Sequence, residues 1–167
     1  NEYFRNLESS YYTVDEFNEK FNRINHLTEL SVVHLNIRSL NSKVKEFLTL
    51  TSLIDINIDV IALSEIWCYN VEFYANILDG YTLYVDLPVS TKVGGIGMFV
   101  KNCLNASVKD DLKLSSTDNN KTENIWLEII KNNKKFIVSG VYRHPNQNVQ
   151  MFTEQIEINL NRLSSGK

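Results

Sequence analysis

Polar residues of types that can take part in catalysis or ligand binding follow three apolar, strand-like segments of this sequence. Asn36 comes at the end of "SVVHLNI" (31–37), Glu65 at the end of "DVIALSE" (59–65), and "YRHPN" (142–146) at the end of "KFIVSGVY". A carboxylate beside an amide suits a hard divalent cation. Tyrosine and arginine can bind phosphoryl oxygens, and asparagine can position a nucleophile. Together these residue types suit a cation and a phosphoryl group.

A structural explanation competes with this chemical one. An ionised Glu65 inside the protein would cost several kcal/mol unless it were paired or bound to a metal, but the strand could equally reach the surface at Ser64 and leave Glu65 solvated. Asn36 could then form an Asx turn. In the same way, Tyr142 could be a core residue and the arginine and histidine after it solvated turn residues. The residue types alone leave both explanations open.

The elements that would position Asn36 and Glu65 form a βαβ unit. Residues 31–37 and 59–65 are rich in β-branched residues, and apolar residues recur at helical spacing over 40–54. Two strands joined by one helix run parallel with a right-handed crossover. Ligands in open α/β sheets bind outside the carboxyl ends of such strands, so both side chains are expected at one crevice.

Other segments extend this pattern. "TVDEFNEKFNRIN" (13–25) begins with a capping box and predicts a short amphipathic helix, and a last helix is expected over about 150–163. The apolar face predicted for that last helix comprises Phe152, Ile156, Leu160 and Leu163. Residues 81–86 and 95–101 are candidate antiparallel strands, and "KNNK" between two apolar runs predicts a hairpin. The "GGIG" stretch (94–97) leads into a strand and not a helix, so we interpret it as a turn and not a phosphate loop.

Composition limits the classes of protein. The 167 residues, 43% of them hydrophobic, fit one globular domain, and a formal charge of −3 gives no general attraction to nucleic acid. Two cysteines form neither a disulfide framework nor a metal quartet, as expected for an intracellular protein with reduced thiols. Without an apolar leader or a membrane-length apolar run, the chain is expected to be soluble, with no membrane partner.

The motifs resemble those of a known superfamily. "VVHLNIRSL", "DVIALSEIW", "GYTLYVD", "GGIGMFVKN", "NIWLEI" and "VSGVYRHPN" are similar, in order and approximate spacing, to the endonuclease/exonuclease/phosphatase superfamily, and most of all to the endonuclease domain of jockey-type non-LTR (LINE) retrotransposons. The resemblance implies a DNase I-like α/β sandwich, with two mixed β-sheets flanked by helices, of which this chain would be the N-terminal portion. Residues 1–27 would be a lead-in with an amphipathic helix, and 28–167 the partial domain.

The resemblance also assigns roles to residues. Glu65 matches the acidic ligand of a catalytic Mg²⁺ (or Mn²⁺), with Asn36 beside it, and Tyr142 matches the tyrosine that contacts the scissile phosphate. Asn146 is similar to the asparagine that closes that motif, although "YRHPN" has one residue more than the "YxPN" form. The catalytic residues implied are therefore Asn36, Glu65, Tyr142 and Asn146. The substrate-binding residues implied are Arg38, Arg143 and His144.

Two motifs of the family are absent from this sequence. A "GDFN"-type segment would supply the aspartate that orients the attacking water, and an "SDH"-type segment the histidine that stabilises the transition state. His26, His34 and His144 come too early in the chain to replace that histidine. Losing such groups costs orders of magnitude in rate, so the chain alone is expected to cut poorly or not at all.

The expected function is therefore that of a metal-dependent phosphodiester hydrolase, the DNA-nicking domain of a retroelement polyprotein that also carries a reverse transcriptase. Such a domain would act on DNA in the nucleus. The alternative is a catalytically inactive remnant that binds nucleic acid or protein. Phosphatase or lipid phosphodiesterase members of the superfamily fit less well, because "YRHP" and the lead-in helix are typical of the retroelement branch.

Overall fold

The computed structural model describes residues 10–22, 29–54, 57–68, 70–88, 93–114 and 122–165. Two short 3₁₀ helices, Glu72–Tyr74 and Asp110–Leu112, accompany the longer elements. Those elements are α1 (Val14–Asn22), β1 (Val32–Asn36), α2 (Leu40–Leu53), β2 (Val60–Ser64), β3 (Tyr81–Asp86), β4 (Ile96–Lys101), β5 (Asn105–Val108), β6 (Thr122–Lys131), β7 (Lys134–Arg143) and α3 (Val149–Ser164).

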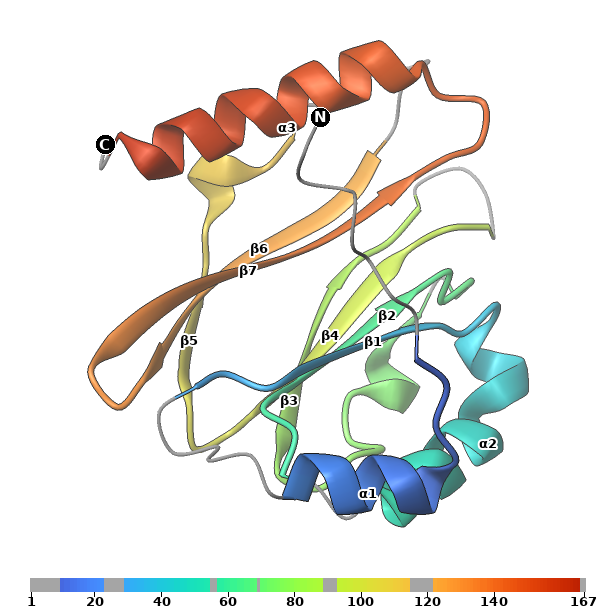
Figure 1. The fold of residues 1–167 in the computed structure, drawn as a ribbon. Coiled ribbons are helices and arrows are strands. Elements are labelled where there is room, and N and C mark those ends of the chain that lie inside the picture. The colour runs from blue at the N-terminus through green and yellow to red at the C-terminus, as the bar shows by residue number, and fades with distance from the viewer. Residues whose placement is uncertain are drawn as a thin grey trace.

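Two sheets pack against each other between outer helices (Figure 1). Sheet A has the strand order β1-β2-β4-β3, and sheet B has the order β5-β6-β7. Strands β1 and β2 are parallel and all other pairs are antiparallel, because only the β1–β2 connection contains a crossover helix. The expected α/β sandwich is confirmed, with one difference, which is that sheet A is mixed and sheet B is antiparallel throughout.

Apolar side chains fill three layers. Strand β2 is buried along its whole length, because its alternate residues face opposite layers. Val60 and Ala62 face sheet B, whereas Ile61 and Leu63 face the helix α2. The third layer lies between sheet B and α3 and is built around Leu112, Leu114 and Trp126. Burial on both faces explains why the β2 segment is an almost uninterrupted apolar run.

Helix α3 occurs where the sequence predicts it, but one residue of its predicted face is wrong. Leu160 is 53% exposed, whereas Asn159 is 4% exposed. The spacing of 152, 156, 159 and 163 keeps one stripe on a helix with 3.6 residues per turn, and position 160 lies beside that stripe. Asn159 is accepted in the core because its Nδ2 donates a hydrogen bond to the carbonyl of Leu112.

The turn predicted at "KNNK" is confirmed, and one strand was not anticipated. Asn132 and Asn133 have φ angles of 50° and 61°, the left-handed pair that a two-residue hairpin turn requires. Strand β5, "NASV", has only four residues and too few apolar ones to give a strand pattern. It forms because β6 offers it a partner.

The lead-in helix α1 has the predicted capping box. Thr13 N and Oγ1 donate to the Glu16 carboxylate, and Glu16 N donates to Thr13 Oγ1. Asn18 Nδ2 then donates to the carbonyl of Leu53, which joins α1 to the end of α2. The predicted domain boundary at residues 27 and 28, and His26 with it, lies outside the described residues.

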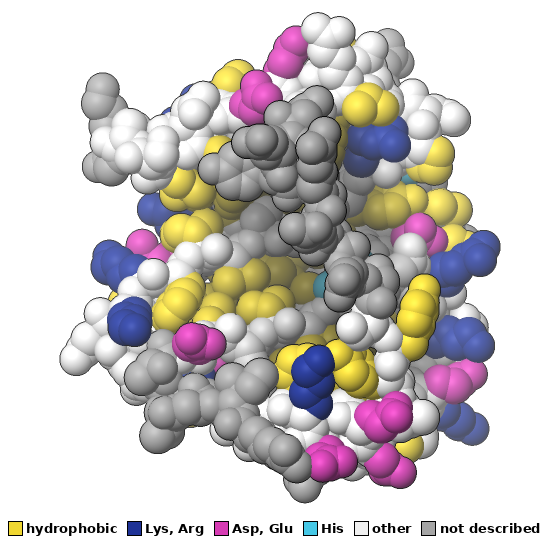
Figure 2. All heavy atoms as spheres, viewed as in Figure 1, with side chains coloured by type: hydrophobic (Ala, Val, Ile, Leu, Met, Phe, Trp, Pro, Cys, Tyr) yellow, Lys and Arg dark blue, Asp and Glu magenta, His cyan; other side chains and the backbone are white. Residues whose placement is uncertain are grey.

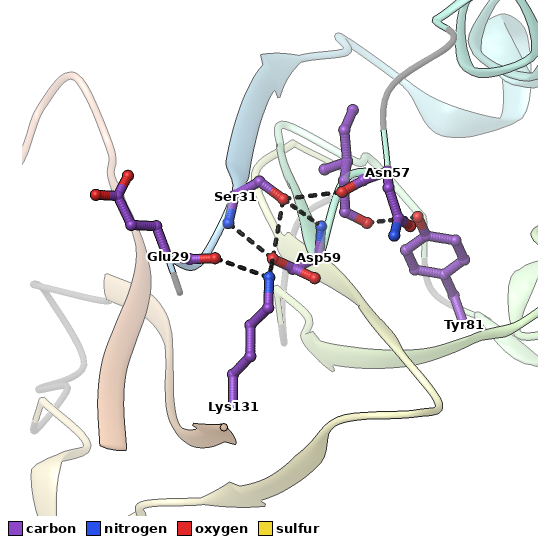
Figure 3. A network of polar contacts seen from close by, with 7 residues as sticks. Glu29, Ser31, Asn57, Asp59, Tyr81 and Lys131 are labelled. Atoms are coloured by element: carbon purple, nitrogen blue, oxygen red, sulfur yellow. Dashed lines mark hydrogen bonds and ion pairs between the residues drawn. The ribbon is translucent and has the colours of Figure 1, made fainter. Parts of the chain in front are cut away.

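A buried polar network closes one end of the sandwich (Figure 3). Asp59, just before β2, accepts hydrogen bonds from Ser31 N and Oγ at 2.9 and 3.0 Å. Lys131, at the end of β6, donates to Asp59 Oδ2 at 2.7 Å and to the carbonyl of Glu29, also at 2.7 Å. The Glu29 side chain points away from this group (Figure 3). A charged pair therefore fastens sheet B to the amino ends of β1 and β2.

Two sheet edges lie open among the described strands. β1 pairs only with β2, and β7 pairs only with β6. Val32 on β1 points the same way as the buried Val60 beside it, yet it is 48% exposed. Figure 2 shows hydrophobic side chains gathered in a hollow in the middle of the visible face of the protein.

In the described residues, no helix is both long and apolar enough to cross a membrane.

Candidate functional site

The carboxyl ends of β1 and β2 are held together by main-chain hydrogen bonds that continue beyond the strands. Ile37 N donates to Ser64 O at 3.0 Å, Ser39 N to Glu65 O at 2.8 Å, and Leu40 N to Ile66 O at 2.9 Å. The two strands therefore turn away from the sheet side by side, and Ser39 becomes the N-cap of α2. These bonds fix the backbone at both predicted ligand positions.

Asn36 and Glu65 meet as the βαβ geometry predicts. Asn36 Nδ2 donates to Glu65 Oε1 at 2.9 Å. Asn36 is exposed and Glu65 half-buried, so the carboxylate is neither fully solvated nor isolated in the core. The amide orientation leaves Asn36 Oδ1 available as an acceptor. Glu65 Oε2 makes no hydrogen bond with any described residue.

Left-handed backbone conformations concentrate around this pair. Outside the hairpin turn, the described non-glycine residues with positive φ are Arg38 (42°), Ser39 (85°), Glu65 (57°) and Trp67 (47°). Such conformations cost about 1–3 kcal/mol each and persist only where surrounding contacts enforce them. All four lie in the two segments that leave β1 and β2, so backbone strain coincides with the predicted site.

Tyr142 reaches the same end of the sandwich from sheet B. Burial raises the pKa of its phenol, and the negative charges of Glu65 and Glu123 raise that pKa further. The phenol therefore stays protonated at neutral pH and can donate a hydrogen bond. The charge of Glu65 thus acts on the phenol. The role predicted for Tyr142 beside the Asn36–Glu65 pair stays a prediction.

Glu123 is a buried acid that the sequence analysis missed. It is 1% exposed, lies opposite Tyr142 in the β6–β7 register, and pairs with His144 Nε2 at 3.0 Å from Oε2 and 3.1 Å from Oε1. The rings of Tyr142 and His144 meet edge to face with centroids 4.9 Å apart. A signal was present in the sequence, because Glu123 shares its strand face with the core residues Ile125, Leu127 and Ile129. A lone acid on an apolar strand face needs a partner.

The glycines of "GGIG" allow the segments to approach closely. Gly94 and Gly95 have φ angles of 105° and 86°. A Cβ at Gly94 would lie 3.0 Å from Glu123 Oε2 and from His144 Cε1, and one at Gly95 would lie 2.8 Å from an Ile66 side-chain carbon. The Gly94 carbonyl also accepts a bond from Trp67 N at 3.0 Å. The two glycines before β4 thus allow Glu123, His144 and Ile66 to pack closely against this segment.

The other predicted site residues, Arg143, Asn146 and Arg38, make no hydrogen bond to Asn36 or Glu65. Arg143 Nη1 donates to three carbonyls of its own turn, those of His144 (3.1 Å), Pro145 (3.4 Å) and Gln147 (2.9 Å). Asn146 is exposed and has no hydrogen bond within the described part of the chain. Arg38 is exposed on the segment after β1. The roles predicted for these residues stay predictions.

A divalent metal fits the Asn36–Glu65 pair with help from substrate and water. The described residues contain no group of three or more His, Cys, Asp and Glu side chains that could hold a metal by themselves. Magnesium, however, is commonly bound by one or two carboxylates, several waters and a substrate phosphate. Glu65 Oε2 and Asn36 Oδ1 offer one charged and one neutral oxygen of the preferred kind.

A cysteine nucleophile is not supported by the structure. Cys68 lies three residues from Glu65 but is 8% exposed. Burial raises the pKa of its thiol, which disfavours the reactive thiolate. The chemistry of this end of the sandwich therefore depends on oxygen and nitrogen groups.

Comparison with known proteins supports the fold. No protein-family model and no curated protein matches the sequence. Among solved structures, the endonuclease domain of TRAS1, a telomere-specific non-LTR retrotransposon, superposes with a TM-score of 0.55 at 13% identity, over 77% of this chain and 52% of that one. TDP2 from D. rerio, complexed with a single-strand DNA product, gives 0.54 at 13% identity over 84% and 56%. The human Nocturnin catalytic domain with bound sulfate gives 0.54 at 14% identity over 82% and 59%.

The chain spans little more than half the length of each of these structures. At such identities the similarity establishes the fold. The fold found independently agrees with the one that the order of the sequence motifs implies. The protein therefore has a DNase I-like α/β-sandwich fold, similar to the fold of these three structures.

Proposed function

We propose that this chain belongs to a metal-dependent phosphodiester hydrolase, the DNA endonuclease domain of a retroelement polyprotein that nicks target DNA. The observation that carries the proposal is the 2.9 Å contact between Asn36 and Glu65. Tyr142 lies near enough for the Glu65 charge to raise its pKa. The motif order, and the similarity in fold to a retrotransposon endonuclease domain, favour the retroelement branch. A reverse transcriptase in the same polyprotein and action in the nucleus belong to this proposal.

The side chains divide the work on a phosphodiester. Glu65 and Asn36 would hold Mg²⁺ or Mn²⁺, which supplies positive charge to phosphate oxygens when bound. Tyr142 donates its phenolic hydrogen to a phosphoryl oxygen, as a protonated phenol can at neutral pH. His144 and Arg38 are candidates for further phosphate contacts, and Asn146 for positioning. Arg143 shapes the turn that presents His144 and Asn146.

Charge elsewhere on the protein gives little help with DNA. The chain carries a formal charge of −3, and Figure 2 shows Lys and Arg side chains interspersed with Asp and Glu on the visible face. Attraction of a polyanion therefore depends on the bound cation and on local cations such as Arg38. DNA binding is expected to require the divalent metal.

A second candidate function rests on the sequence. The "GDFN"-type and "SDH"-type segments, which the family uses for the water and the transition state, are absent from these 167 residues. The chain alone would then bind metal and DNA with little or no cleavage. Nicking of supercoiled plasmid by a longer chain that also carries both segments separates the two candidates, because only a hydrolase converts plasmid to the relaxed form.

Metal binding by the 167-residue chain tests the shared basis of both candidates. Manganese binding, followed by electron paramagnetic resonance, is expected to weaken at least about tenfold in Glu65→Gln, because the variant removes the one charged ligand proposed. The matched control is Glu72→Gln, an exposed acid on a 3₁₀ helix. Equal affinity in the wild type and Glu65→Gln would refute the metal site. In a longer chain with both missing segments, Glu65→Ala should abolish nicking.

A further inference from the structure

Glu123 is the most buried acid among the described residues, and the proposed chemistry does not use it directly. Its side chain is 1% exposed and its carboxylate spans the Nε2 atom of His144 at 3.0 and 3.1 Å. Burying a carboxylate is costly unless it is well paired, and breaking such a pair leaves an uncompensated charge. A neutral residue on this strand face, like its neighbours Ile125 and Leu127, would avoid the cost.

The contact fixes the chemical form of the histidine. An ionised carboxylate has no hydrogen to donate, so the hydrogen of this bond lies on His144 Nε2. His144 Nδ1 makes no hydrogen bond with any described residue, and the side chain is 27% exposed. The free nitrogen is therefore an acceptor when the ring is neutral and a second donor when the ring is protonated.

The contact also fixes the ring's position. Gly94 leaves little room for a side chain, because a Cβ there would lie 3.0 Å from both Glu123 Oε2 and His144 Cε1. On its other side the imidazole packs edge to face with Tyr142, with centroids 4.9 Å apart. Such aromatic pairs have a preferred geometry. The carboxylate, the imidazole and the phenol thus form one connected group.

We propose that Glu123 is a positioning residue: its buried carboxylate accepts the Nε2–H of His144 and holds the ring against Tyr142. The Tyr142 hydroxyl, and His144 Nδ1–H when the ring is protonated, can then donate to a phosphate bound at Glu65. The phosphate part of this statement rests on the proposed function. The arrangement of the three side chains does not, and it can be measured without metal, DNA or activity.

Nitrogen NMR of the histidine-labelled 167-residue chain tests the arrangement directly. His144, assigned by comparison with His144→Gln, should show a protonated Nε2 and an unprotonated Nδ1 at a pH where the ring is neutral. A predominant Nδ1–H form in the wild type would overturn the proposal, whatever any variant does.

Carbon NMR of ring-labelled tyrosine gives the second measurement. In Glu123→Gln, an isosteric change, the pKa of Tyr142 should shift downwards because one of the charges that raise it is removed. The Nε2–H preference of His144 should weaken, because a glutamine side chain can either accept from or donate to Nε2. Glu128→Gln is the matched control on the same strand, since Glu128 pairs with the exposed Lys135 at 3.3 Å and should change neither quantity. An unchanged Tyr142 pKa together with an unchanged His144 tautomer in Glu123→Gln would also refute the positioning role.

Binding of inorganic phosphate in the presence of manganese links the arrangement to the site. Affinity for phosphate should fall several-fold in Glu123→Gln while affinity for manganese, followed separately, stays at the wild-type value. If manganese fails to bind even to the wild type, the proposed metal site is wrong but the NMR results still decide the positioning role. If phosphate affinity is unaffected in the variant, the link between Glu123 and the phosphate is refuted.

Discussion

Removing one partner of the Asp59–Lys131 pair should cost a large share of this protein's stability. The two side chains are only 4% and 13% exposed, and their 2.7 Å contact joins the amino end of β2 to the end of β6. Asp59→Asn keeps the shape and removes the charge, so the buried Lys131 loses its ion pair with Asp59. Removing one partner of a buried pair costs about 3–5 kcal/mol. Domains of this kind have a free energy of unfolding of about 5–15 kcal/mol, so the change should be plain in urea denaturation.

The control for this prediction is an exposed pair on α2. Lys43 and Glu46 are 51% and 61% exposed and lie 3.1 Å apart, so Glu46→Gln should leave the stability nearly unchanged. Replacing both buried partners, as Asp59→Leu with Lys131→Met, should recover much of the loss, because the stranded charge is removed. A change below about 1 kcal/mol in Asp59→Asn would refute the reasoning. It would mean that water reaches the pair and that the two sheets are not fastened there.

Three further changes probe other parts of the structure. Burial, followed by the charge of Asp59, raises the pKa of Tyr81 above its ordinary value of 10.0. The protonated phenol therefore contributes stability below about pH 10, and this contribution is lost as pH rises through the raised pKa. In thermal melts from pH 8 to 11, the stability of Tyr81→Phe should fall less than that of the wild type. Asn159→Ala should cost about 1–3 kcal/mol by leaving a carbonyl unpaired, whereas Leu160→Ala on the same helix should cost about 0.5 kcal/mol or less, measured by urea unfolding. If DNA binds, Arg38→Gln should reduce the salt dependence of affinity by about one counterion, and Arg143→Gln should leave that slope unchanged because Arg143 is engaged with its own turn.

The elements predicted from the sequence are those with strong local signals. The βαβ unit is confirmed because β-branched strands and a helical repeat differ clearly in period, and its geometry brings Asn36 to Glu65 as expected. The "KNNK" turn is confirmed because asparagine tolerates the left-handed conformation. Strand β5 could not be found in this way, since its four residues are held by β6 and not by a pattern of their own.

Residues of the site were predictable where the motif was local and missed where the contact was distant. Glu123 lies 21 residues before His144, and only the β6–β7 pairing brings the two together. Leu160 was placed in the core because the pattern counted only apolar residues, whereas a buried Asn159 satisfies a carbonyl there. In both cases a polar side chain in the interior was overlooked, because its partner lies elsewhere in the sequence.

The two ends of the sandwich use buried charge in different ways. At one end, Asp59 and Lys131 are both withdrawn from water and bridge the sheets. At the other, Glu65 keeps an oxygen without a partner among the described residues, and strained backbone surrounds it. A residue that served stability alone would gain by completing its hydrogen bonds and relaxing its backbone. Because sheet A supplies Glu65 and sheet B supplies Tyr142 and His144, the site also depends on the angle between the sheets. The Asp59–Lys131 contact between the sheets therefore helps to keep the Tyr142 phenol and the Glu65 carboxylate at a fixed separation at the other end.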